Sequence, residues 1–230
     1  MALRGCPVLG FDTETTGVRV EADRIVTTAL VARAADGSVT ERTWLIDPGV
    51  EIPPPAQAVH GITTEYAREH GAAPEVALEE IATALVAGLA AGVPVLAFNA
   101  SYDLRIIEAD LARHGLATLA DRLGRPVAPV IDPLVIDRGV DRYRRGKRKL
   151  ADLMSVYRVA PSDHLHDALE DVRQAIAVFD AMAGAYPELD AMDLAGLHAW
   201  QAAKHKEWAI NFNDYLARQG KVGDVDPTWP

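Results

Sequence analysis

Residues 7–17 read PVLGFDTETTG, a short apolar run that ends in two acids separated by one threonine. Such a run is typical of a buried β-strand. Side chains alternate between the two faces of a strand, so Asp12 and Glu14 point to the same face. The stretch therefore predicts a first strand over 7–14 with two carboxylates together at its end.

Two adjacent carboxylates raise each other's pKa unless a cation neutralises them. Hard divalent cations bind through carboxylate oxygens, so Asp12 and Glu14 indicate a metal site. An acidic strand end that faces solvent is the alternative interpretation, and these two residues alone leave both open. Further acids have to join them before a site is specified.

The remaining pattern predicts a mixed α/β fold. Two more strands, at 24–34 and 39–46, are joined by the Asp36-Gly37-Ser38 turn and pair antiparallel with the first. Regular structure is expected to stop at the three prolines 53–55. Apolar spacing then predicts buried strands at 93–98 and 127–131, and helices at 74–91, from about 101 to 115, at 149–157 and at 167–185.

Beyond Pro187 the sequence predicts one more helix and a polar tail, so we divide the chain into 1–187 and 188–230. Aromatic residues recur along that helix every few positions: Trp200, Trp208, Phe212 and Tyr215. Such a stripe usually packs on its own domain. A surface for a partner is the alternative.

Composition excludes several classes of protein. The chain has 230 residues, a net charge of −10 and one cysteine, Cys6, so an internal disulfide is impossible. No apolar stretch is long enough for a signal peptide or a membrane span, and we expect a cytoplasmic protein without membrane contact. The negative charge also argues against a general basic surface for nucleic acid.

One segment departs from this acidic background. Six positive charges fall within eight residues, at Arg142, Arg144, Arg145, Lys147, Arg148 and Lys149. Such a segment can hold a phosphodiester backbone. A solvated, mobile loop explains the same composition equally well.

Two further acids accompany Asp12 and Glu14. Asp103 falls in the first turn of the helix that follows strand 93–98, where a carboxylate also stabilises the helix dipole. His166 precedes Asp171 by five residues, at the start of the helix over 167–185. Because His166 lies before the expected helix cap, it can face the same pocket as Asp171.

The order of these motifs resembles the DEDDh, or DnaQ-like, exonuclease superfamily, which includes the proofreading subunit of bacterial replicative DNA polymerase and ribonuclease T. The resemblance rests on Phe11 to Gly17, Asn99 to Asp103, and His166 with Asp171, and covers about residues 7–185. It implies a ribonuclease H-like fold with a mixed five-stranded sheet and flanking helices, to which the C-terminal helix is an extension. It also implies 3′→5′ hydrolysis of nucleic acid to nucleoside 5′-monophosphates.

The resemblance also implies roles for individual residues. Asp12, Glu14, Asp103 and Asp171 would bind two Mg²⁺ or Mn²⁺ ions, and His166 would be the general base. The 3′ end of a single strand would contact a further set of residues: Thr13, Thr15, Thr16, Gly17, His60, Asn99 and Tyr102. For His60, within the His-Gly-Ile-Thr segment at 60–63, a loop-packing role is an equal alternative.

The sequence leaves the substrate open. DNA is preferred, but RNA trimming is an alternative because recognition of the 2′-hydroxyl depends on pocket geometry. A non-catalytic binding module or a hydrolase of a small phosphodiester are the other readings, and the complete set of acids with His166 speaks against the first. No polymerase signature accompanies the nuclease motifs, so proofreading would require a separate polymerase subunit.

Overall fold

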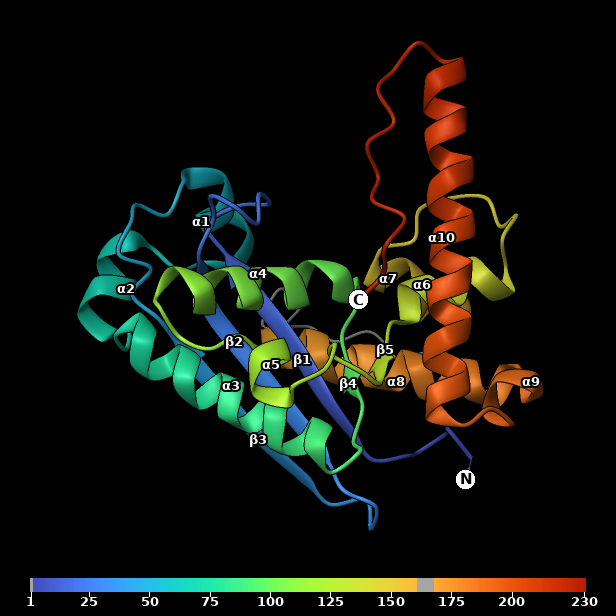
Figure 1. The fold of residues 1–230 in the computed structure, drawn as a ribbon, viewed down its shortest axis with the longest axis horizontal. Helices are drawn as coiled ribbons and strands as arrows, with labels where there is room; N and C mark the ends of the chain where they lie inside the picture. Colours follow the sequence, from blue (N-terminus) through green and yellow to red (C-terminus); the bar gives the residue numbers. More distant parts are fainter. Residues whose placement is uncertain (1, 161–167) are drawn as a thin grey trace.

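A computed structural model describes residues 2–160 and 168–230 (Figure 1). Within them, five strands form one sheet in the order β3-β2-β1-β4-β5. The first three, β1 (Val8–Thr15), β2 (Ile25–Arg33) and β3 (Val39–Leu45), pair antiparallel, whereas β4 (Val95–Leu96) and β5 (Val130–Ile131) continue the sheet in parallel from β1. The mixed five-stranded sheet flanked by helices is confirmed.

Helices cover both faces of the sheet, and β1 lies between them (Figure 1). On one face, Leu9 and Phe11 pack against α3 (Pro74–Ala90) and α4 (Ala100–Arg113). On the other, Val8 packs with α7 (Leu150–Tyr157) and α8 (Ala168–Ala185). The strand that carries the first two acids is therefore buried on both sides.

Close backbone approach fixes these helices on β1. A Cβ at Gly10 would lie 2.4 Å from Cγ1 of Val172 on α8, and one at Gly88 would lie 2.1 Å from Cδ1 of Leu9. Only glycine leaves the space that these two contacts need. The start of α8, and with it Asp171, is thereby held against the sheet.

Five short helices were not predicted. They are α1 (Pro54–His60), α2 (Thr64–His70), α5 (Leu119–Leu123), α6 (Pro133–Val140) and α9 (Pro187–Asp190). The expectation that the prolines at 53–55 stop regular structure is wrong, because α1 begins at the second of them. Proline is favoured in the first turn of a helix, where its missing N–H has no intrahelical acceptor.

The C-terminal region is α10 (Leu194–Arg218) and a tail that returns alongside it (Figure 1). Leu197 and Gln201 of α10 are buried, and Gln201 Nε2 donates to the carbonyl of Val130 on β5 at 2.9 Å. Near the chain end Trp229 is buried in the core, with its ring 5.2 Å from that of His198. None of the helices in the described ranges has the length and apolar character needed to cross a membrane.

The basic segment between α6 and α7 folds around a buried acid. The Asp137 side chain is fully buried and forms ion pairs with Arg144 and Arg148, and its Oδ1 accepts from the Tyr157 hydroxyl at 2.8 Å. Arg148 also donates to the carbonyl of Asp141. Two of the six cations, Arg144 and Arg148, therefore stabilise the fold of the loop. The sequence alternatives of a phosphate-binding segment and a solvated loop apply only to the other four.

Replacing the buried acid tests this arrangement. Asp137→Ala leaves two arginines without their partner, and we expect a loss of about 3–5 kcal/mol in the free energy of unfolding. Asp141→Ala is the matched control, because its pair with Arg144 is more exposed and longer, at 3.6 Å, and should cost under about 1 kcal/mol. Equal losses in urea denaturation would contradict the structural role of Asp137.

Candidate active site

Three elements bring four carboxylates towards one place. Asp12 and Glu14 lie near the end of β1, Asp103 lies in the first turn of α4, and Asp171 lies in the first turn of α8. Burial raises the pKa of Asp12 well above its ordinary value, and the charges of Asp103, Glu14 and Asp171 raise it further. The other three carboxylates thus all disfavour the charged form of Asp12.

Asp103 is the most buried of the four, with 3% of its surface exposed. Burial raises its pKa to about 7, although hydrogen bonds from Thr13 oppose that shift. The backbone N–H and the hydroxyl of Thr13 both donate to Oδ1 of Asp103, at 3.1 and 2.7 Å. Thr13, proposed from the sequence as a substrate contact, therefore holds α4 to β1 and orients Asp103.

The donor set suits hard cations. Carboxylate oxygens are the ligands that Mg²⁺ and Mn²⁺ prefer, and a half-buried cluster of like charges is stabilised by positive charge. In the described part of the chain, no three His, Cys, Asp or Glu side chains already stand as a metal-binding group.

The Thr15–Gly17 segment forms a rigid turn beside the acids. The Tyr102 hydroxyl donates to the Gly17 carbonyl at 2.5 Å and lies 2.8 Å from Oγ1 of Thr15. Thr16 Oγ1 donates to Asp23 Oδ1 at 3.3 Å, and a Cβ at Gly17 would lie 2.6 Å from the same carboxylate. The turn is therefore tied to α4 on one side and to the 19–24 loop on the other.

A buried acid that the sequence analysis missed shapes the start of α4. Asp132 accepts from the backbone N–H groups of Asn99 at 3.1 Å, Ala100 at 3.0 Å and Leu134 at 2.9 Å. Its own N–H donates to Gln201 Oε1 at 2.7 Å, which links α10 to this point. Asp132 before Pro133 is the usual pattern of a helix cap followed by proline, so the signal was present in the sequence.

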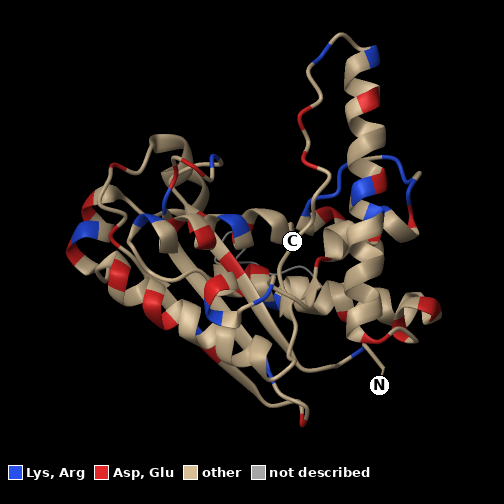
Figure 2. Cartoon of the chain, viewed as in Figure 1, with Lys and Arg blue, Asp and Glu red and all other residues tan. Residues whose placement is uncertain are grey.

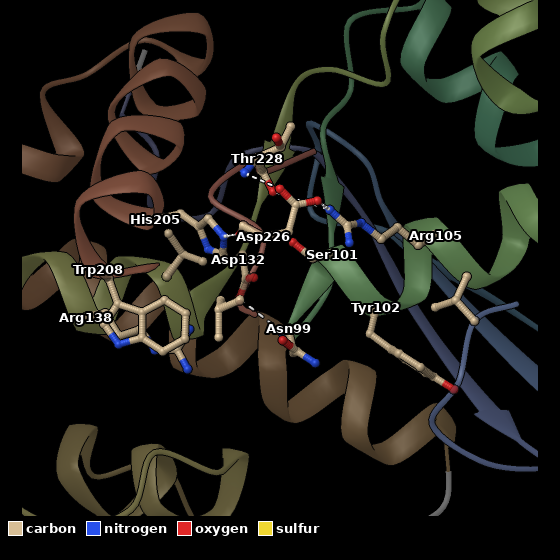
Figure 3. A pocket seen from close by; sticks show the side chains of 13 residues that line it. Asn99, Ser101, Tyr102, Arg105, Asp132, Arg138, His205, Trp208, Asp226 and Thr228 are labelled. Carbon is tan, nitrogen blue, oxygen red and sulfur yellow. Dashed lines mark hydrogen bonds and ion pairs between the residues drawn. The ribbon is translucent and has the colours of Figure 1, made fainter. Parts of the chain in front are cut away.

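A cavity of about 270 Å³ borders the start of α4, as Figure 3 shows. Asn99, Ser101 and Tyr102 form one side, and the C-terminal tail forms another with Asp226 and Thr228. Asn99 has a left-handed backbone, with φ at 67°, which asparagine tolerates better than most residues. Asn99 and Tyr102, both expected near the substrate, thus share one cavity.

A second cavity, of about 490 Å³, includes Glu14 and His60 in its lining. His60 Nδ1 accepts from the N–H of Ile62 at 3.1 Å, which folds the 60–63 segment. Burial lowers the pKa of His60, and the Thr15 carbonyl beside it opposes the shift. His60 therefore has the packing contacts of a loop residue and also faces a cavity that reaches Glu14.

His166 lies outside the described residues, so its role as general base stays a prediction. The expected start of its helix at 167 also falls there, and the described part of α8 begins at Ala168.

Comparison with known proteins identifies the family of this chain. Residues 9–179 match the family model described as "Exonuclease". The chain belongs to this family. With its motifs in order and its fold matching, it is a member of the DEDDh (DnaQ-like) exonuclease superfamily.

Three similar proteins illustrate the relationship. A PolC-type DNA polymerase III of Lacticaseibacillus paracasei is 29% identical over 162 residues, which is 70% of this chain and 10% of the polymerase. Exonuclease I of Escherichia coli, in a complex with a dT13 oligonucleotide, superposes with a TM-score of 0.65 at 19% identity over 80% of this chain and 42% of the other. Exonuclease I of Methylocaldum szegediense superposes with a TM-score of 0.67 at 21% identity, over 92% of this chain and 46% of the other.

The chain therefore spans a tenth of the curated relative and under half of these structures. The structural likeness establishes the shared fold.

Neutralising Asp12 tests the electrostatics. Without metal, Asp12→Asn should raise the melting temperature, because it removes a repelled carboxylate, by about 2–4 °C per kcal/mol relieved. The stabilisation that Mn²⁺ gives the wild type should shrink in this variant. Asp36→Asn, in the exposed turn between β2 and β3, is the control. An undiminished Mn²⁺ effect in Asp12→Asn, measured by calorimetry, would contradict a metal site at Asp12.

Proposed function

We propose that the chain is a 3′→5′ exonuclease that hydrolyses single-stranded nucleic acid, preferably DNA, to nucleoside 5′-monophosphates. The observation that carries this proposal is the convergence of the Asp103, Glu14 and Asp171 charges on Asp12, from three separate elements. Membership of the exonuclease family supports the reaction class.

Each acid has a role in this proposal. Asp12, Glu14, Asp103 and Asp171 hold two Mg²⁺ or Mn²⁺ ions, which supply Lewis-acid stabilisation to an in-line displacement at phosphorus. His166 accepts the proton of the attacking water, a role suited to an imidazole that titrates near neutral pH. Thr13 keeps the Asp103 carboxylate oriented through its two hydrogen bonds.

We place the terminal nucleoside in the cavity that Glu14 and His60 share. Tyr66 and Ile62 give this cavity apolar surface, and Thr28 contributes a buried hydroxyl that makes no hydrogen bond within the described structure. Sites for small ligands combine apolar surface with polar groups that fix the orientation of the ligand. The Thr15–Gly17 turn follows Glu14 in the chain and is bonded to Tyr102, and in this proposal its carbonyls and hydroxyls contact the last sugar.

DNA is the preferred substrate because the structural neighbours include Exonuclease I bound to a dT13 oligonucleotide. Proofreading for a DNA polymerase is the biological role we favour, since the matching segment of the PolC-type protein belongs to a DNA polymerase.

Product analysis tests the proposal. Single-stranded DNA and RNA of equal sequence, labelled at either end, are incubated with Mg²⁺, with Mn²⁺ and with EDTA. We expect a ladder from the 5′-labelled DNA, immediate release of a labelled mononucleotide from the 3′-labelled DNA, and no reaction in EDTA. Asp12→Ala should abolish the ladder and Asp36→Asn should keep it. A ladder from RNA alone would overturn the DNA preference, and intact strands throughout would overturn the enzyme.

His166→Ala separates the base from the metal ligands. We expect kcat to fall by about 10²- to 10⁴-fold, because proton transfer by a positioned side chain contributes an acceleration of that size. Stabilisation by Mn²⁺ should stay as in the wild type, since His166 is not proposed as a ligand. Normal kcat in this variant, or loss of the Mn²⁺ effect, would contradict the assignment.

A further inference from the structure

A groove of about 710 Å³ runs between α10 and the basic segment that joins α6 to α7. Aromatic rings and basic side chains line it together: Tyr143, Trp208, Phe212, Tyr215, Arg142 and Lys204. Figure 2 shows the basic segment as a blue run beside α10. The groove thus unites two sequence features that the proposed active site leaves without a role, the aromatic stripe and the positive charges.

The aromatic stripe divides along α10. Trp200 packs against Gly139, where a Cβ would lie 2.4 Å from its ring, so the first part of the stripe belongs to the core. Further along, the rings of Trp208 and Phe212 are 5.4 Å apart and 11° from parallel, and those of Phe212 and Tyr215 are 6.3 Å apart at 24°. Packing in the domain explains the first part of the stripe and leaves the second on the surface.

These outer rings are accessible. Tyr143 is 85% exposed, Tyr215 55% and Phe212 37%. Exposed apolar side chains that are grouped together and bordered by charge are typical of a binding site. A row of flat rings is the kind of surface on which unpaired bases stack.

The charges beside the rings suit phosphate. Arg145, Lys147 and Lys149 are exposed on the segment, whereas Arg144 and Arg148 are held by Asp137. Across the groove, Arg142 and Lys204 share the single acid Glu207. A chain of net charge −10 thus presents a local positive surface.

This groove shares a wall with the cavity at the start of α4. Arg138 and Trp208 line both, and the Arg138 guanidinium lies 3.6 Å from the centre of the Trp208 ring. Ser101 and Tyr102 line the same cavity (Figure 3). Asp103 is the next residue of α4. The groove therefore adjoins a cavity that borders the first turn of α4, the helix that carries Asp103.

We propose that this groove holds the single strand on the 5′ side of the nucleotides being removed, with bases on Phe212, Tyr215 and Tyr143 and phosphates near Arg145 and Lys147. The inference rests on the proposed function, because the strand enters from the active site. Stacked rings favour unpaired bases over a duplex, in which the base faces are covered. An acidic peptide would satisfy the charges but leave the row of near-parallel rings without a matching ligand.

Two double variants test the groove, each with a control. Phe212→Ala with Tyr215→Ala removes the rings, and Ile210→Ala, an exposed apolar residue of the same helix outside the groove, is its control. Arg145→Ala with Lys147→Ala removes two charges, and Arg68→Ala with Lys206→Ala removes the same charge elsewhere. Unchanged melting temperatures verify that each variant folds.

Binding is measured first, by fluorescence anisotropy of labelled oligothymidylate in EDTA. The oligonucleotide has about 20 nucleotides, which is longer than the usual footprint of such grooves. We expect affinity to fall about 5- to 150-fold for each ring removed. The salt dependence of binding should weaken by about 0.7 in logarithmic slope for each cation removed. The control variants should bind as the wild type does.

Turnover is then compared on the long strand and on a trinucleotide, with Mg²⁺. The groove variants should lose kcat/KM on the long strand and keep the wild-type value on the trinucleotide. Wild-type binding and turnover in both groove variants would overturn the proposal. So would binding of an aspartate-rich peptide that these variants lose while they keep the DNA. If the wild type hydrolyses neither substrate, the proposed function fails, and the anisotropy measurement still decides whether the groove binds DNA.

Discussion

Asp12 lies half-buried beside the carboxylates of Glu14, Asp103 and Asp171, and the packing around β1 has to contain their repulsion. Without a cation this arrangement destabilises the fold, because burial and like charges both raise the pKa of Asp12. The protein maintains it by close contact of α8 with Gly10 and by the hydrogen bonds that join Thr13 to Asp103. We propose that a bound divalent cation relieves this repulsion.

The strongest sequence signals proved to be those with a fixed period. Alternation along β1 placed Asp12 and Glu14 together, and helical spacing located α3 and α8 within a few residues of their observed bounds. Short helices were missed because fewer than three turns carry little periodicity, and proline at 54 was read as a stop although it starts α1.

Tertiary contacts account for the remaining differences. The substrate contact expected of Thr13 stays a prediction. Its hydroxyl also donates to Asp103 across ninety positions of sequence, a contact that no local pattern encodes. The sequence also does not show which cations of the basic segment are structural and which are exposed. Arg144 and Arg148 pair with Asp137 only once the loop has folded around that acid. The same folding leaves the remaining charges beside the aromatic face of α10, and the core of the fold thus determines which surface is free to bind.

Anomalous diffraction from crystals soaked in Mn²⁺ with a nucleoside 5′-monophosphate decides whether the four acids hold metal ions. Two peaks are expected among the carboxylates of Asp12, Glu14, Asp103 and Asp171, with the phosphate of the nucleotide bound to them. Absence of Mn²⁺ at these four acids, with the nucleotide bound elsewhere, would contradict the proposed metal site.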